Sequence, residues 1–312
     1  MRIVFFGTSD FAVPALDRLA AGHDVVGVFT QPDRRRGRGE VVTPTPVKAA
    51  ALTRNLPVFA PEALRGDEAA LGAFAAPAPD IGVVVSYGLF LPKEWLSVPR
   101  YGCLNLHGSL LPRYRGAAPV QRALMAGEAK TGVTVIRLTG TMDAGPILAA
   151  AETEIAPDET AGDLLARLAR LGAPLLADSV TAVGEGRATE KLQNENEATF
   201  APALKKEEGF IAWNRPARGI AARVRGLTPW PGACTFWTDR KGGRRRFLIT
   251  KAHVGPGGGG TPGEIVALGE GISVATAEGI LVLERVKPEG KREMSGAEFA
   301  RGQGLTIGSC LT

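Results

Sequence analysis

The chain has 312 residues, of which 45% are hydrophobic and 22% charged, a composition typical of a globular protein with material for about two domains. No segment approaches the roughly 18 apolar residues of a membrane span, and the N-terminal MRIVFFG lacks a signal-peptide pattern, so we expect no membrane partner and a cytoplasmic location. The net charge of +5 is concentrated in residues 205–312, where 17 Lys and Arg stand against 10 Asp and Glu; this bias fits a polyanionic partner and plain solubility equally well.

The first 180 residues alternate short apolar runs with helical segments. Strands are predicted at 2–6, 24–30, 81–86, 103–107 and 132–138, and helices at 11–21 and 163–183. This alternation predicts an α/β fold built on a doubly wound, Rossmann-like, mostly parallel sheet. Ligands of such sheets bind beyond the carboxyl ends of the strands, so polar residues there are candidates for a site.

The composition turns polar between residues 184 and 208, which predicts an inter-domain linker. Beyond it, short strands separated by glycine-rich turns are predicted at 246–254, 264–268, 272–275 and 280–286. Ser295 and Glu298 form a capping box that begins a short helix. We therefore expect a small, OB-like β-barrel with Trp213 and Trp230 in its core. The predicted domains are residues 1–188 and 208–312, joined by the linker 189–207.

The most informative segment is the strand CLNLH and the glycine that ends it. Side chains alternate along a strand, so Asn105 and His107 share one face while Leu104 and Leu106 point to the other. An amide and an imidazole therefore stand together near the carboxyl end of an apolar strand. A buried polar group without a partner costs about 1–3 kcal/mol, so the pair is either hydrogen-bonded within the core or part of a site.

A second polar group favours a site. The strand 132–138 leads into a glycine-flanked loop that contains Asp143, and a parallel strand would bring this loop to the same edge of the sheet. An amide, an imidazole and a carboxylate suit acyl transfer to an amine: Asn105 can donate to an oxyanion, His107 can stabilise charge or carry a proton, and Asp143 can accept the proton that the amine loses.

Other kinds of site fit the sequence less well. A serine triad is disfavoured because Ser109 lies two residues from His107 in HGSL, without the GxSxG elbow. The segment 7–11 lacks the later glycines of a dinucleotide-binding turn. No metal site is evident, and the cysteines, far apart and odd in number, are expected to be reduced and structural: Cys103, Cys234 and Cys310.

The motifs NLH (105–107), SLLPRYRGAAP (109–119) and DAGP (143–146) together resemble the signature of the folate-dependent formyltransferases. The resemblance implies 10-formyltetrahydrofolate as the formyl donor and Asn105, His107 and Asp143 as catalytic residues. It also implies that two segments border the folate: Ser109, Leu110, Leu111 and Pro112, and Ser86, Tyr87, Gly88, Leu89 and Phe90.

The acceptor is suggested by basic segments and by the second domain. The loop 30–39 carries four arginines and resembles the tRNA-gripping insertion of those family members that formylate the methionine on initiator tRNA; the segments 203–213 and 223–233 are similar to theirs. This implies initiator methionyl-tRNA as partner, with no obligate protein partner, and tRNA contacts by Arg34, Arg35, Arg36, Arg38, Lys205 and Lys206. Glu40 and Val41 depart from the basic pattern, and a solvated charged loop is the alternative. An amino-sugar nucleotide or another small amine stays open as acceptor.

Overall fold

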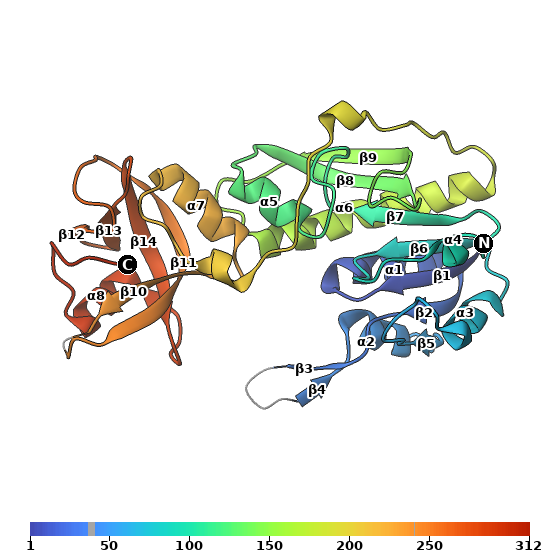
Figure 1. Ribbon diagram of the computed structural model, residues 1–312, viewed down its shortest axis with the longest axis horizontal. Helices are drawn as coiled ribbons and strands as arrows, with labels where there is room; N and C mark the ends of the chain where they lie inside the picture. Colours follow the sequence, from blue (N-terminus) through green and yellow to red (C-terminus); the bar gives the residue numbers. More distant parts are fainter. Residues whose placement is uncertain (37–40, 240) are drawn as a thin grey trace. The chain divides into compact units, whose positions relative to one another are not determined.

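The computed structural model describes residues 1–36, 41–239 and 241–312, and the chain divides into two compact units. The first unit comprises Met1–Pro119, Lys130–Glu154 and Leu165–Pro202, and the second comprises Val120–Ala129, Ile155–Leu164 and Ala203–Thr312 (Figure 1). Arg38 and Glu40 lie outside the described residues, and the domain limits at 188 and 208 stay a prediction. No helix in the described part of the chain is long and apolar enough to cross a membrane.

A seven-stranded sheet forms the centre of the first unit, in the order β5-β2-β1-β6-β7-β8-β9. Its strands are β1 (Arg2–Gly7), β2 (Asp24–Phe29), β5 (Val58–Phe59), β6 (Ile81–Val85), β7 (Cys103–His107), β8 (Lys130–Arg137) and β9 (Ile147–Glu154). The first five in this order pair in parallel. The predicted doubly wound, mostly parallel sheet is confirmed.

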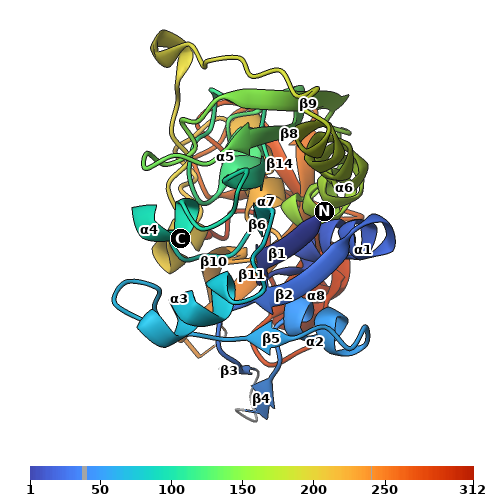
Figure 2. The same ribbon diagram turned by 90° about the vertical axis from the view of Figure 1, so that its right-hand side faces the viewer.

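Helices cover both faces of this sheet, as Figure 2 shows. One face carries α1 (Val13–Gly22), α2 (Pro46–Leu52) and α6 (Ala161–Gly184), and the other carries α3 (Glu68–Ala75) and α4 (Lys93–Leu96). The strands β6 and β7 are buried along their whole length because layers of side chains cover both of their faces. Phe74 of α3 and Trp95 of α4 stack with ring centroids 5.3 Å apart in an aromatic core on the second face.

The direction of β8 in the sheet differs from the predicted one. The strand β8 pairs antiparallel with β7, with Leu104 opposite Arg137 and His107 opposite Thr134, and β9 in turn pairs antiparallel with β8. The loop after β8 therefore begins beside the amino end of β7, and the parallel arrangement expected for it was wrong. Asp143 still lies 3.5 Å from His107, because the β8–β9 loop runs back toward the carboxyl end of β7.

The second unit contains an antiparallel sheet that curls into a half-barrel, in the order β10-β11-β14-β13-β12, with β15 paired to β14. Its elements are α5 (Pro119–Met125), η3 (Lys206–Gly209), α7 (Ala217–Gly226), β10 (Ala233–Thr238), β11 (Arg244–Gly255), β12 (Ile265–Leu268), β13 (Ile272–Ala275), β14 (Ile280–Pro288), β15 (Met294–Ser295) and α8 (Gly296–Gln303). The predicted capping box is present at the start of α8, where Ser295 accepts from the Glu298 backbone.

The two tryptophans expected in the core of this unit differ in their exposure to solvent. Trp213 is buried and donates its indole N–H to Thr235 Oγ1 at 3.1 Å. Trp230 is 58% exposed, so its predicted place in the core was wrong. Pro229 and Pro231, both preceded by cis peptide bonds, flank Trp230 in a tight turn that leaves its ring on the surface.

Candidate active site

The carboxyl ends of β1, β6 and β7 meet at one edge of the sheet. The three strands are parallel neighbours, with Gly7 opposite Val85 and Val84 opposite Asn105. The segments that follow β6 and β7 therefore leave the sheet side by side. These are the two segments that the sequence singled out, residues 86–90 and 109–112.

Asn105 and His107 point away from the helix that covers the other face of β7. Leu106 packs against α6, where a Cβ on Gly172 would come within 2.7 Å of the Leu106 side chain. The alternation along β7 then sends its neighbours the other way. Asn105 and His107 are only 8% and 6% exposed, so both groups sit at the edge in a largely desolvated place.

The His107 ring lies between two acceptors. Its Nε2 is 2.9 Å from the carbonyl oxygen of Tyr114, and its Nδ1 is 3.5 Å from Asp143 Oδ2. A carbonyl oxygen only accepts, so Nε2 carries a hydrogen. The Nδ1 of the ring faces the Asp143 carboxylate, so both ring nitrogens are directed at acceptors.

Asp143 is held in an unusual backbone conformation, with φ of +50°, in the loop between β8 and β9. Its Oδ2 accepts a hydrogen bond of 2.8 Å from the backbone N–H of Gly116 and faces His107. Among the described residues, its Oδ1 has no hydrogen-bond donor. One carboxylate oxygen is thus engaged by Gly116, and the other has no donor among the described residues.

The Asn105 side chain makes no hydrogen bond to another residue in the described part of the chain. An almost buried amide without a protein partner has a donor available for a ligand oxygen. The structure therefore brings His107 and Asp143 together, and it places Asn105 on the same face of β7.

Ser109 has a structural role. It is fully buried and donates its hydroxyl to the Arg113 carbonyl at 2.7 Å. Thr134 ties the same segment to β8, because its hydroxyl donates to the Ser109 carbonyl and accepts from the backbone N–H of Leu111. The Leu111-Pro112 bond is cis. Because the Ser109 hydroxyl already donates to the Arg113 carbonyl, it is not available as the nucleophile of a serine triad. The two-residue spacing between Ser109 and His107 disfavours that triad as well.

The segment 86–90 is fixed mainly through its backbone. Thr8 and Gln31 both donate to the Tyr87 carbonyl, at 2.7 and 3.2 Å, and Ser9 donates to the Ser86 hydroxyl at 2.7 Å. The Tyr87 ring turns into the aromatic core, where burial raises the pKa of its hydroxyl. Ser86, Gly88 and Phe90 are exposed and Leu89 is half-buried, so Tyr87 is the one residue of the segment whose side chain a ligand cannot reach.

A group that sequence reasoning missed surrounds Asp143. Gln193 donates its amide to the carbonyl oxygens of Asp143 and Gly145, at 2.8 and 2.7 Å. Arg115, whose side chain is 4% exposed, donates to Gln193 Oε1 and pairs with both carboxylate oxygens of Glu195. The hydrogen bond to Glu195 is the main cause that raises the pKa of Arg115, and the charge of Asp143 adds to it. The sequence motif contained Arg115, but nothing in the polar segment 184–208 marked Gln193.

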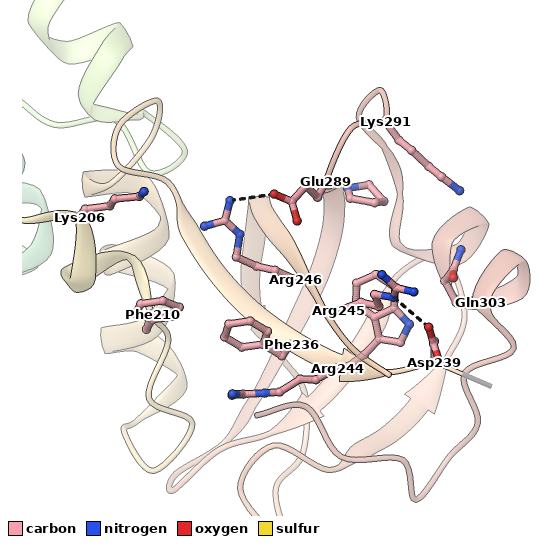
Figure 3. A pocket seen from close by; sticks show the side chains of 12 residues that line it. Lys206, Phe210, Phe236, Asp239, Arg244, Arg245, Arg246, Glu289, Lys291 and Gln303 are labelled. Carbon is pink, nitrogen blue, oxygen red and sulfur yellow. Dashed lines mark hydrogen bonds and ion pairs between the residues drawn. The ribbon is translucent and has the colours of Figure 1, made fainter. Parts of the chain in front are cut away.

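A basic and aromatic groove of about 910 Å³ opens on the second unit (Figure 3). Phe210 and Phe236 stack at 5.7 Å, and the Arg244 guanidinium lies 3.9 Å from the centre of the Phe236 ring. Phe210 is 48% exposed, so the stack presents an open aromatic face. The groove is lined by Lys206, Phe210, Phe236, Trp237, Asp239, Arg244, Arg245, Arg246, Pro288, Glu289, Lys291 and Gln303.

The positive charge in this groove exceeds the negative charge. Both acidic residues are already paired, Asp239 with Arg245 at 2.9 Å and Glu289 with Arg246 at 3.8 Å. In the part of the chain that the structure describes, Lys206 and Lys291 have no acidic partner. The groove therefore offers cationic groups and an aromatic surface together, a combination that binds single-stranded nucleic acid.

The predicted basic residues outside this groove lie in two places. Lys205 precedes the turn η3, which is held because Glu208 accepts from the Lys205 backbone and pairs with Arg122. The arginine-rich loop forms a hairpin of β3 (Arg34–Arg36) and β4 (Val41–Thr43), and the exposed Arg34 donates to Gln31 at 3.0 Å. Arg35 and Arg36 belong to β3.

The three cysteines are free, with Cys103 and Cys234 buried and Cys310 exposed. Burial raises the pKa of the Cys103 thiol to about 12, which suits a packing role. Among the residues that the structure describes, no group of three or more His, Cys, Asp or Glu could hold a metal ion.

Comparison with known proteins gives matches over nearly the whole chain. Residues 1–180 match the family model "Formyl transferase", and residues 203–304 match "Formyl transferase, C-terminal domain". The methionyl-tRNA formyltransferase of Parvibaculum lavamentivorans is 46% identical over 313 residues, covering all of both chains. That of Roseiflexus castenholzii is 43% identical over all of this chain and 99% of its own.

Among solved structures, the fold is similar to that of WlaRD, a sugar 3N-formyl transferase crystallised in the presence of dTDP and 5-N-formyl-THF. The TM-score is 0.68 with 15% identity, over 94% of this chain and 99% of that one. At this identity the likeness concerns the fold alone.

Proposed function

The chain belongs to the formyl transferase family, and on this premise we propose that it transfers the formyl group of 10-formyltetrahydrofolate to the α-amino group of initiator methionyl-tRNA. The geometry at the carboxyl end of β7 supports this proposal. The Asp143 carboxylate lies 3.5 Å from His107, and the Asn105 amide on the same strand face has no partner among the described residues. We place the reaction in the cytoplasm, where free cysteines and a tRNA substrate are both expected.

The reaction forms one bond and breaks one. The neutral amine nitrogen bonds to the formyl carbon, whose oxygen takes a negative charge, and collapse then breaks the bond between that carbon and the donor nitrogen, which leaves with a proton. The α-amino group at a peptide N-terminus has a pKa of about 7.7–8.0, and the ester bond to tRNA lowers the pKa of the methionine amine further. Much of this amine is therefore neutral near pH 7–8 without a strong base. The chain must therefore mainly stabilise the oxyanion and the proton transfers.

Each catalytic residue has a role that its surroundings support. The Asn105 amide donates to the oxyanion, because its own hydrogen-bond capacity is not used within the described protein. His107, with both ring nitrogens directed at acceptors, supplies positive charge beside that oxygen when it is protonated. Asp143 Oδ1 accepts the proton that the attacking amine loses, because Oδ2 is engaged by Gly116.

The donor would lie along the edge of the sheet formed by the segments 86–90 and 109–112. The first offers backbone groups and the half-exposed Phe90, and the second begins beside His107. Folate combines a flat ring, which apolar surfaces bind, with hydrogen-bonding edges, which free backbone groups bind. The formyl group supplied by this donor is what the residues on β7 would act on.

The acceptor is proposed from the relatives and from the groove. Two full-length relatives, 46% and 43% identical, are named methionyl-tRNA formyltransferases. Lys206 lines the groove of the second unit, and we propose that this groove, Lys205 and the arginines of the segment 30–39 (Arg34, Arg35, Arg36 and Arg38) contact tRNA phosphates and bases. A small amine would use no such surface.

One experiment separates the possible acceptors. Purified protein is incubated with 10-formyltetrahydrofolate and, in separate reactions, with initiator methionyl-tRNA, with an amino-sugar nucleotide or with glycinamide ribonucleotide. We expect N-formylmethionine from the first reaction at a kcat/KM at least 10²-fold above the others. Preferred formylation of a small amine would overturn the assignment, and release of free formate without transfer would indicate a hydrolase.

A further inference from the structure

A polar segment between α6 and the second unit, residues 191–201, reaches across the catalytic loop. We call it the strap; in Figure 1 it is part of the yellow segment that passes β9 after α6. At its start, Lys191 exchanges two backbone hydrogen bonds with Ile147, of 2.8 and 2.9 Å. At its end, Ala201 donates to the Arg115 carbonyl at 2.7 Å, and its own carbonyl accepts from Ala118 at 3.1 Å. Both ends are therefore fixed to the first unit.

Between these ends most strap residues are exposed, yet Gln193 is half-buried and all of its hydrogen-bonding groups are used. Its two amide hydrogens serve two carbonyls, those of Asp143 at 2.8 Å and Gly145 at 2.7 Å. Its oxygen accepts from Arg115 Nη2 at 2.7 Å and Nε at 3.1 Å. Arg115 is in turn fixed by Glu195, so the Gln193 amide has one orientation.

The loop that carries Asp143 needs such an external support. Within residues 139–144 the described hydrogen bonds are long, 3.5 Å between Ala144 and the Thr141 carbonyl and 3.3–3.4 Å between Thr139 and Thr141. Asp143 itself has φ of +50°, a conformation that a non-glycine residue keeps only when its surroundings impose it. Gln193 binds the carbonyl of Asp143 and that of the second residue after it.

The strap also reaches the second catalytic residue. Thr199 accepts the Tyr114 backbone N–H on its hydroxyl at 2.8 Å and the Arg115 N–H on its carbonyl at 2.8 Å. The Tyr114 carbonyl is the group that receives His107 Nε2. One segment thus supports both members of the pair that face each other across 3.5 Å.

We infer that Gln193 is a positioning residue for the reaction: through its amide nitrogen it holds the β8–β9 loop so that the Asp143 carboxylate stays against His107. Arg115 orients this amide, and Glu195 completes the support. Gln193 acts only through Asp143, which gives the inference a distinctive kinetic consequence. This inference depends on the proposed function only because the assay measures formylation of methionyl-tRNA.

The test uses Gln193→Leu, which removes all of its hydrogen bonds, and Gln193→Glu, which keeps the acceptor for Arg115 and removes both donors. The control is Leu192→Ala, because Leu192 is the neighbouring strap residue and is 80% exposed. A displacement of about 1 Å in a catalytic group can cost about 10²-fold in rate. We expect both Gln193 variants to lower the single-turnover formylation rate between about 10-fold and 10²-fold, with the KM for methionyl-tRNA within about two-fold of the parent and Leu192→Ala unchanged.

A double-mutant cycle with Asp143→Asn separates positioning from general stability. Once the carboxylate is gone, Gln193→Leu should slow single turnover by less than about two-fold. An equal loss in the parent and Asp143→Asn backgrounds would overturn the inference, as would full activity of both Gln193 variants in the parent background.

A structural readout keeps this test apart from that of the proposed function. In crystals of Gln193→Leu without substrates, the distance from Asp143 Oδ2 to His107 Nδ1 should exceed the present 3.5 Å by about 1 Å or more. An unmoved carboxylate would refute the positioning role. If the parent protein formylates nothing, the proposed function fails, and this measurement still decides the role of Gln193.

Discussion

Adding one methyl group at Gly145 should disable the site without touching a catalytic side chain. A Cβ at this position would lie 1.7 Å from the carbonyl oxygen of Arg137, which is backbone at the end of β8 and cannot rotate away. Real Cβ contacts are essentially never under 3.0 Å, so Gly145→Ala must move the loop by about 1.3 Å. Asp143 is two residues away and moves with it.

This displacement sets the expected cost. A shift of about 1 Å in a catalytic group lowers the rate by about 10²-fold, which corresponds to about 2.7 kcal/mol of lost transition-state stabilisation. The measurement is single-turnover formylation of methionyl-tRNA at saturating donor, together with thermal unfolding of the same preparation.

Gly140→Ala is the matched control in the same loop, because its Cβ would meet only the flexible end of Lys93, at 3.3 Å. We expect its turnover to stay within about two-fold of the parent protein. Gly145→Ala with parental turnover and an unmoved carboxylate would refute the argument that loop position controls the chemistry.

Three further outcomes are expected. Asn105→Ala should lower the single-turnover rate about 10²–10³-fold while tRNA affinity stays near that of the parent; an unchanged rate would remove Asn105 from the oxyanion. Replacing Lys206 by Ala should weaken tRNA binding and reduce the magnitude of the slope of log K against log salt concentration by about 0.7–0.9. The control Lys130→Ala, at a residue paired with Glu152 on β9, should leave this slope unchanged. A slope for Lys206→Ala equal to that of the parent protein would exclude a phosphate contact by Lys206. The pKa of Glu208 is lowered, mainly by its hydrogen bond to Arg122, so its stabilisation is complete above the unfolded pKa of about 4.3 and is lost as the pH falls through the folded pKa. Glu208→Gln should therefore lower the free energy of unfolding by about 1 kcal/mol at pH 7. The difference should shrink as the pH falls below the unfolded pKa, and a constant difference in urea titrations across this range would contradict the reasoning.

The sequence predicted the main strands of the first unit because each is a short run of apolar residues bounded by polar ones. The strand of Asn105 and His107 was located at its observed limits, 103–107, and its alternation placed both residues on one face. The orientation of β8 was missed, since an apolar run does not state its direction in the sheet. Val58–Phe59 was missed because two residues are too short to show a period.

Parts of the site were not predictable for a different reason. Gln193 is 50 residues from Asp143, and the composition around it is that of a solvated linker. Its role comes from a long-range contact that leaves no local pattern. Trp230 was placed in the core because aromatic residues are usually buried. Hydrophobicity alone does not show that the backbone at this position directs the side chain into solvent.

The unequal exposure of the tryptophans offers a built-in optical probe. Of the four in the chain, Trp95, Trp213 and Trp237 are buried, and Trp230 is the exposed one. A soluble quencher such as acrylamide should therefore extinguish the emission of a single indole in the native protein, on a background of three shielded fluorophores. Titration with RNA, followed by this quenching, would report directly whether a ligand covers the turn between Pro229 and Pro231.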